Sequence, residues 1–114
     1  MKLEFEKKVH MVSELISYCH LKGAAQYHLD MDNCDKTTTT IIISASPVKL
    51  SADELDLLQT YLCAPRRSDM EQEYWNLTGE SEDSTELRLV GMMCDKATIE
   101  YSGQDLKLIL ERDL

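Results

Sequence analysis

Apolar residues recur every three or four positions over residues 4–22, which is the spacing of one buried face of an α-helix. The stripe consists of Phe5, Val9, Val12, Ile16 and Cys19, and Met11, Leu15 and Tyr18 widen it. Gly23 follows as the residue type that commonly ends a helix in the left-handed conformation. The pattern predicts a first helix whose stripe packs against the core.

Two β-strands are predicted next. Residues 24–31 alternate between polar and apolar, residues 32–36 are rich in turn formers, and residues 37–45 are β-branched almost throughout. On the second strand one face would carry Thr39, Ile41, Ile43 and Ala45. We expect an antiparallel hairpin with one face apolar enough to cover a helix layer.

A second helix should begin at Ser51. Pro47 has no N–H for a strand ladder, so the preceding strand should end near it. Ser51 and Glu54 have the spacing of a capping box, in which each side chain accepts a hydrogen bond from the other residue's backbone N–H. The helix should run to about Cys63, and it should bury Leu55, Leu58 and Leu62.

Residues 64–83 have no clear period and read as a long surface loop, a kind of segment that often serves as a lid or a binding segment. Its Tyr74 and Trp75 would either fold over a cleft or anchor a partner. A cap pattern at 83–86 and the apolar positions Leu87, Val90 and Cys94 predict a third helix. Residues 97–101 and 106–112 predict a closing hairpin.

The predicted order is helix, strand, strand, helix, long loop, helix, strand, strand. The fold class that buries all these faces most simply is α+β, a two-layer sandwich with three helices packed on one face of a mixed, mainly antiparallel sheet. With 114 residues, the chain should form a single domain over residues 1–114.

Charge and composition narrow the functional classes. The net charge is −9, from 21 acidic and 12 basic residues, so phosphate backbones would be repelled and no nucleic-acid partner is expected. No stretch reaches the roughly 20 apolar residues of a membrane span, so we expect no membrane contact and a cytoplasmic location. The cysteines Cys19, Cys34, Cys63 and Cys94 match no metal or redox spacing, so they should fill the core.

The order of elements resembles the ATP-binding (GHKL-type) domain of sensor histidine kinases over nearly the whole chain. ISASPVKLSADELDLLQTYL is similar to the family's strand, its Asp-x-Gly-x-Gly turn and the helix after it. STELRLVGMMCDKATIEYSGQDLKLILER is similar to the family's Gly-x-Gly-Leu helix and its last hairpin. The resemblance implies a histidine-kinase ATPase-like fold and a nucleotide cleft beside the joint after residue 46.

The motifs that bind nucleotide in the family are replaced in this chain. The positions of the vestigial cleft would be Glu14, Tyr18, Ala45, Ser46, Lys49, Ser84 and Glu86. Glu14 and Tyr18 stand where the family has Asn residues near Mg²⁺, and Ala45 or Ser46 stands where its adenine-binding Asp would be. Pro47 and Lys49 replace turn glycines, while Ser84 and Glu86 replace the glycines that meet phosphate.

We therefore expect a degenerate member of that family, a regulatory or interaction module in signal transduction with no catalytic residue, metal or cofactor of its own. Its partners would be another protein or other domains of a signalling protein. One alternative is a working domain that binds Mg-ATP and supports histidine phosphotransfer together with a histidine-bearing domain. A second is an unrelated small α+β protein-binding module.

Overall fold

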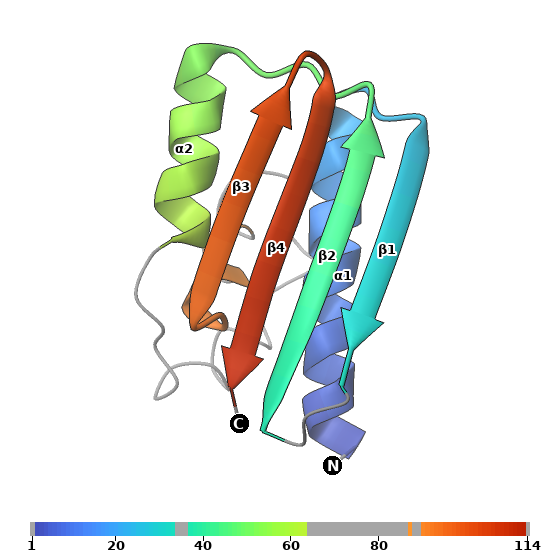
Figure 1. Cartoon of the computed structure of the whole chain (residues 1–114), viewed down its shortest axis with the longest axis vertical. Coiled ribbons are helices and arrows are strands. Elements are labelled where there is room, and N and C mark those ends of the chain that lie inside the picture. The colour runs from blue at the N-terminus through green and yellow to red at the C-terminus, as the bar shows by residue number, and fades with distance from the viewer. Residues whose placement is uncertain (1, 34–36, 64–86, 88–89, 114) are drawn as a thin grey trace.

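The computed structural model describes residues 2–33, 37–63, 87 and 90–113. Its elements are α1 (Lys2–Leu21), β1 (Gln26–Asp32), β2 (Thr38–Ser46), α2 (Ala52–Leu62), β3 (Lys96–Ser102) and β4 (Asp105–Asp113) (Figure 1). Residues 87 and 90–92 are also helical. Every predicted element that lies in the described part of the chain is present, with its ends within a few residues of the predicted ones.

The strands form one four-stranded sheet in the order β1-β2-β4-β3. Each neighbouring pair is antiparallel, so the mixed sheet that we expected is wrong for the described strands. The reason lies in the connection through α2, which carries the chain back along the sheet so that β3 runs parallel to β2 (Figure 1). β4 then returns between those two strands and separates the parallel pair.

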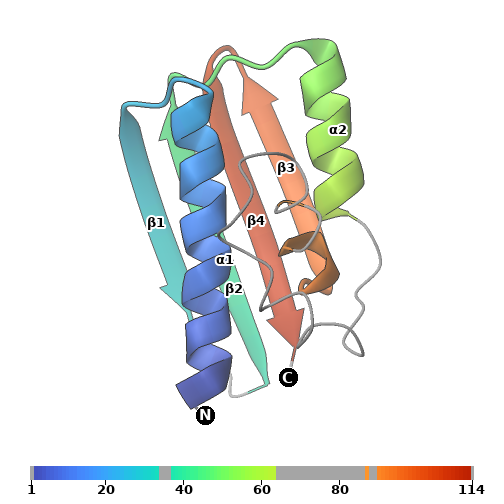
Figure 2. The same ribbon diagram turned by 180° about the vertical axis from the view of Figure 1, so that it is seen from behind.

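Both helices cover the same face of the sheet, so the two-layer α+β arrangement is confirmed (Figure 2). Along β2, buried and half-buried residues alternate, and the buried ones are the predicted set Thr39, Ile41, Ile43 and Ala45. Leu106, Leu108 and Leu110 of β4 oppose Ala45, Ile43 and Ile41 in the register and are buried with them. The centre of the core is therefore the helix side of β2 and β4.

The buried face of α1 is rotated from the predicted one. Phe5 and Val9 are 54% and 47% exposed, whereas Met11, Leu15 and Cys19 are fully buried. α1 packs over β2 and leaves β1 at the margin of the sheet (Figure 2). The helix therefore buries the side nearest β2 and α2, and the part of the stripe that turns toward the sheet edge stays exposed.

α2 has the predicted start. Ser51 is its N-cap, and both hydrogen bonds of the capping box with Glu54 are present. Leu58 and Leu62 are buried as predicted, but Leu55 is only partly buried. The peptide bond between Ser46 and Pro47, just after β2, is cis.

The cysteine prediction holds for two residues only. Cys19 and Cys94 are buried free thiols, whereas Cys63 at the C-terminal cap of α2 is exposed. The expected core position of Cys63 is wrong because α2 ends there and the side chain lies beyond the packed face. Cys34 lies outside the described residues, as do the predicted cap at 83–86 and the loop with Tyr74 and Trp75.

The helical residues before β3 approach α2 closely at Gly91. A Cβ atom at this position would overlap the carbonyl oxygen of Tyr61. Leu87, Val90 and Cys94 are buried, as the sequence predicts. Gly91 therefore sets how near this segment comes to the C-terminal end of α2.

We predict that Gly91→Ala destabilises the fold by about 1–3 kcal/mol, the usual cost of overfilling a packed site. The free energy of unfolding in urea would measure this loss. At an unhindered helical position the same change would stabilise by up to about 1 kcal/mol, because alanine is the better helix former. The sign of the change in unfolding free energy therefore distinguishes a crowded position from an open one. A Gly91→Ala protein that is more stable would contradict the close approach of Gly91 to Tyr61.

Candidate functional site at the joint between β2 and α2

The joint at residues 47–51 is tied to two other parts of the chain through its backbone. The N–H of Val48 donates to the carbonyl of Gln104 in the β3–β4 turn at 2.8 Å. The N–H of Lys49 donates to the carbonyl of Lys22 after α1 at 3.1 Å. Both groups are therefore used inside the protein, and they hold the joint between the end of α1 and the last hairpin.

Tyr101 of β3 anchors the same joint through its side chain. Its hydroxyl donates to the carbonyl of Val48 at 2.6 Å and accepts from the N–H of Leu50 at 3.1 Å. Val48 is fully buried beneath these contacts. One phenol thus pairs two backbone groups that would otherwise need water or a ligand.

The N-terminus of α2 is occupied by the protein's own carboxylate. Glu54 accepts from the N–H of Ser51 at 2.9 Å, and the N–H of Glu54 donates to the Ser51 hydroxyl at 3.1 Å. The free N–H groups and the positive dipole at a helix N-terminus are what attract phosphate. A phosphate here would have to displace Glu54 and would also meet the carboxylate of Asp53 in the first turn.

Glu54 also joins α2 to α1. Lys22 donates from Nζ to the second carboxylate oxygen of Glu54 at 2.5 Å, and its Nζ lies 5.6 Å from the centre of the Tyr18 ring. We call this contact the Lys22–Glu54 bridge. The hydrogen bond from Lys22, followed by that from the Ser51 backbone, lowers the pKa of Glu54. Burial, with smaller effects of the Glu54 and Cys19 charges, raises the pKa of Tyr18 to about 12.

The residues predicted for the cleft do not converge on one site. Glu14 is only 8% exposed, and its carboxylate lies 3.7 Å from Nε2 of His10 one turn earlier in α1. Tyr18 is half-buried beside the Lys22–Glu54 bridge. Ala45 is buried in the core, whereas the next residue, Ser46, points to the opposite face of the sheet.

Lys49 is exposed, and its side chain has no described partner in the cleft region, while its N–H serves the joint. Ser84 and Glu86 lie outside the described residues. The structure therefore places Glu14, Tyr18 and Ala45 on the helix side of the sheet and separates Ser46 from them. The sequence did not indicate which residues hold the joint. They are Tyr101, Lys22 and Gln104, and each lies far from the joint along the chain.

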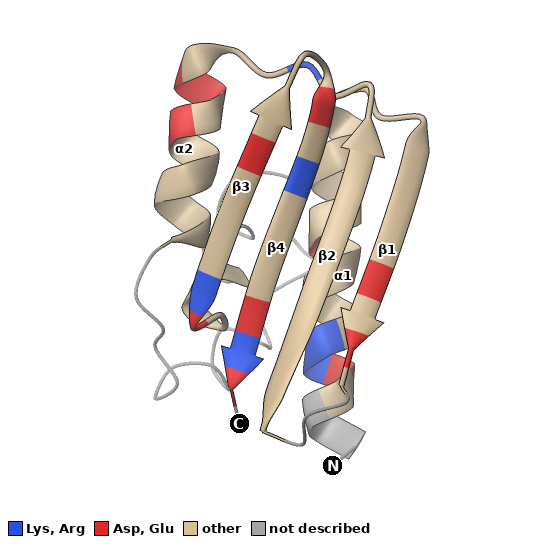
Figure 3. Cartoon of the chain, in the orientation of Figure 1, with Lys and Arg blue, Asp and Glu red and all other residues tan. Residues whose placement is uncertain are grey.

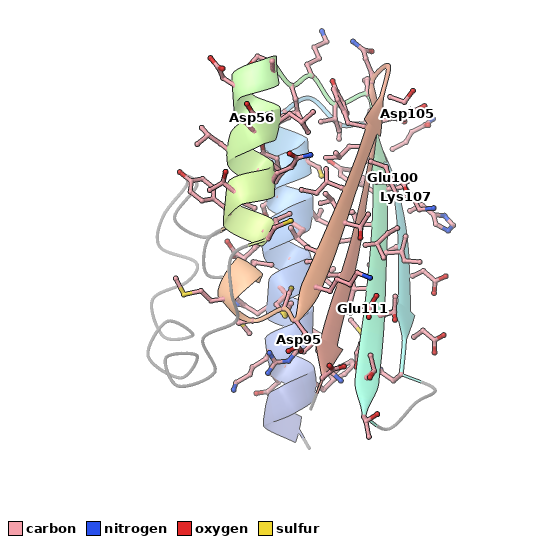
Figure 4. The ribbon with its side chains drawn as sticks, turned by 60° about the vertical axis from the view of Figure 1, so that its left-hand side comes forward. Asp56, Asp95, Glu100, Asp105, Lys107 and Glu111 are labelled. Carbon is pink, nitrogen blue, oxygen red and sulfur yellow. The ribbon has the colours of Figure 1, made fainter. Side chains whose placement is uncertain are left out.

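The open face of the sheet carries a shallow depression that the sequence did not reveal. Its volume is about 620 Å³, and its polar lining includes His28, Ser46, Glu100, Asp105 and Lys107. In side view Glu100, Asp105 and Lys107 point away from the helices (Figure 4). Charges of both signs alternate over β3 and β4, whereas β2 between them and β1 has none (Figure 3). On the described strands this face is mainly acidic, because Asp30, Asp32, Glu100, Asp105, Glu111 and Asp113 share it with only Lys96 and Lys107.

The described residues contain no group of three or more His, Cys, Asp or Glu side chains placed to hold a metal ion. No helix in the described part of the chain is long and apolar enough to cross a membrane. Comparisons of the chain with models of known protein families, with curated proteins and with solved structures found no match.

We predict that Tyr101→Phe lowers the free energy of unfolding by about 1–3 kcal/mol, because two partly buried backbone groups at Val48 and Leu50 lose their partner. Urea unfolding would measure it. The comparison variant is Tyr27→Phe: Tyr27 is 41% exposed and its hydroxyl donates to one backbone carbonyl, that of Ala24 at 3.1 Å, so a smaller loss is expected. An equal loss in both variants would contradict the anchoring role of Tyr101.

We predict that Glu54→Gln is less stable than the unchanged chain at neutral pH and that this difference shrinks on acidification. The lowered pKa of folded Glu54 means that its stabilisation is present above the unfolded value of about 4.5 and is lost as pH falls through the folded value. Chemical unfolding from pH 3 to pH 7 measures both proteins. In a Lys22→Met background the difference should be smaller and should depend less on pH. A difference that is unchanged there would argue against the Lys22–Glu54 bridge.

Proposed function

We propose that the chain is a protein-interaction module of histidine-kinase ATPase-like architecture that has lost the nucleotide chemistry of that family. The arrangement of elements supports the architecture: α1 precedes the β1–β2 hairpin, α2 follows β2, and a helical segment precedes the β3–β4 hairpin. This is the order on which the sequence resemblance rests. The module would act in signal transduction by contact with another protein or domain.

One observation carries the loss of nucleotide binding. Each backbone N–H from Val48 to Ser51 donates to an acceptor within the protein, and the N-terminus of α2 holds the carboxylate of Glu54. A turn that binds phosphate needs free N–H groups aimed at the ligand. In the joint between β2 and α2 these N–H groups already donate hydrogen bonds to other groups of the protein.

The side chains at the replaced motif positions support the same proposal. Ala45 offers a methyl group to the core where the family's adenine-binding Asp would be, and its neighbour Ser46 faces the other side of the sheet. Tyr18 places a phenol beside the Lys22–Glu54 bridge, at one of the two family Asn positions. Neither Ala45 nor Tyr18 supplies an amide or carboxylate oxygen for a base or for Mg²⁺.

The exposed apolar surface supports a role in binding. Among the residues that the structure describes, six large apolar side chains are between 41% and 64% exposed, namely Phe5, Val9, Leu21, Tyr27, Leu29 and Leu57. Single exposed apolar residues are common, but a group on neighbouring elements marks an interaction surface. All but Leu57 lie on α1, on β1 or on the turn between them.

We predict no change in the thermal unfolding midpoint when Mg-ATP or Mg-ADP is added at millimolar concentration. A ligand at 100 times its Kd would stabilise the fold by about 2.7 kcal/mol, which raises the midpoint of a 114-residue domain by several degrees. Magnesium chloride alone and Mg-GTP serve as controls for ion and nonspecific effects. A saturable upward shift specific to adenine nucleotides would overturn the proposal and favour a working ATP-binding domain.

A further inference from the structure

β1 is an edge strand with one side unpaired in the described part of the chain. It pairs with β2 over the whole range Gln26–Asp32, and no described strand lies on its other side. An exposed edge presents N–H and C=O groups to which a further strand can pair. β1 is seven residues long, and the N–H and C=O groups of every second residue point outward, where a further strand could pair with them.

The helix side of this edge is also uncovered. α1 packs over β2, and β1 lies outside it at the edge of the sheet (Figure 2). Leu29 and Tyr27, whose register partners Ile43 and Ala45 face the helices, are 46% and 41% exposed. The buried side of the sheet thus continues past α1 as apolar surface.

α1 adds two more exposed apolar side chains near the end of β1, where Lys8 donates to the side-chain oxygen of Asn33 at 3.3 Å. The ring of His20 lies 3.3 Å from the hydroxyl of Tyr27, which fixes the side of α1 that faces β1. Val9 precedes His20 by about three helical turns and so lies on that side, with Phe5 one turn before it. We call Phe5, Val9, Tyr27 and Leu29 the β1 surface.

We propose that the β1 surface binds a second copy of this chain, with the two β1 strands paired antiparallel about a twofold axis at Leu29. This deepens the proposed function by naming the first partner of the module. It rests on the geometry of the edge and not on the absence of nucleotide binding, so each proposal can fail alone.

The sequence of β1 is complementary to itself in this register. Directly opposite residues of an antiparallel pair share one face of the sheet, with Cβ atoms about 4.5–5.5 Å apart. Centring on Leu29 sets His28 opposite Asp30 of the second copy, so that each imidazole can donate a hydrogen bond to a carboxylate on the open face. On the helix side Leu29 meets Leu29, and Tyr27 meets Met31 of the second copy.

The neighbouring symmetric registers are worse. A centre at Asp30 would set the two Asp30 carboxylates directly opposite each other, and like charges in that position are destabilising. A centre at His28 would set the two His28 imidazoles opposite each other and would pair fewer residues of the two β1 strands. The Leu29 centre alone uses all seven residues of β1 and pairs unlike groups, and a shift by one residue would exchange the two faces of the sheet.

A twofold axis perpendicular to the sheet puts both copies of α1 on one face of a continuous sheet. Leu29 and Tyr27 lie in the centre of the contact. Phe5 and Val9 lie on the side of α1 that faces β1, but beside the end of β1, where Lys8 contacts Asn33, so they belong to the margins of the contact.

We predict that the whole chain sediments at twice its monomer mass at tens of micromolar in about 0.15 M salt, where the Debye length of about 8 Å screens the mutual repulsion of the two acidic chains. Leu29→Lys should return it to monomer, since it puts two ammonium groups at the centre of the pairing. Leu57→Lys is the matched control: Leu57 is 50% exposed but lies on α2, so this variant should remain dimeric. Circular dichroism and urea unfolding confirm that both variants fold.

A charge exchange tests the register itself. His28→Asp and Asp30→His should each weaken the dimer at least tenfold, and the double variant should recover most of that loss because it restores unlike pairs across the axis. A folded monomer at several hundred micromolar would overturn the proposal. So would a dimer that survives Leu29→Lys, or one in which the double variant is no better than either single one. Loss of assembly in Leu57→Lys with retention in Leu29→Lys would assign the contact to α2.

Discussion

The antiparallel pairing of β2 with β4 is the contact on which the rest of the structure depends. It joins Thr38–Ser46 to Asp105–Asp113, two segments far apart in the chain, and sets Ile41 and Ile43 against Leu110 and Leu108 in the centre of the core. Because β4 lies between β2 and β3, the last hairpin is fixed on one side of β2, and the β1 hairpin remains on the other. On one side of this sheet α1 lies over β2 and α2 lies along β3, and β1 remains at the uncovered edge (Figure 2).

The joint after β2 follows from that pairing. With β4 beside β2, the β3–β4 turn comes next to residues 47–50, and Gln104 and Tyr101 supply hydrogen bonds to its backbone. The Lys22–Glu54 bridge completes the enclosure from the side of α1. A joint that could have held a ligand is instead a point where three parts of the chain are fastened together. Its polar groups stabilise the fold, which is why a structural role and not a binding role is proposed for it.

The edge at β1 is the converse case. There the sheet stops without a covering element in the described residues, and apolar side chains of α1 and β1 remain exposed together. Among the described residues, the backbone N–H groups of the joint are satisfied within the protein, whereas most of the exposed large apolar side chains lie on α1 and β1. The proposed interaction function and the proposed dimer both rest on this difference. The backbone of the joint is hydrogen-bonded within the protein, whereas β1 has no described strand on its outer side.

The sequence by itself determined the local elements. The β-branched run of β2, the cap at Ser51 and the left-handed residue Gly23 depend on neighbours a few positions away, so periodicity and turn chemistry predict them. The face of α1 that is buried, the wholly antiparallel sheet and the exposure of Cys63 depend on which distant segments meet, and no local pattern encodes that. The candidate site divides in the same way. The residues of the joint could be named from the chain. The hydrogen bonds that the joint receives from Gln104, Tyr101 and Lys22 depend on the tertiary structure, because those three residues belong to other parts of the chain.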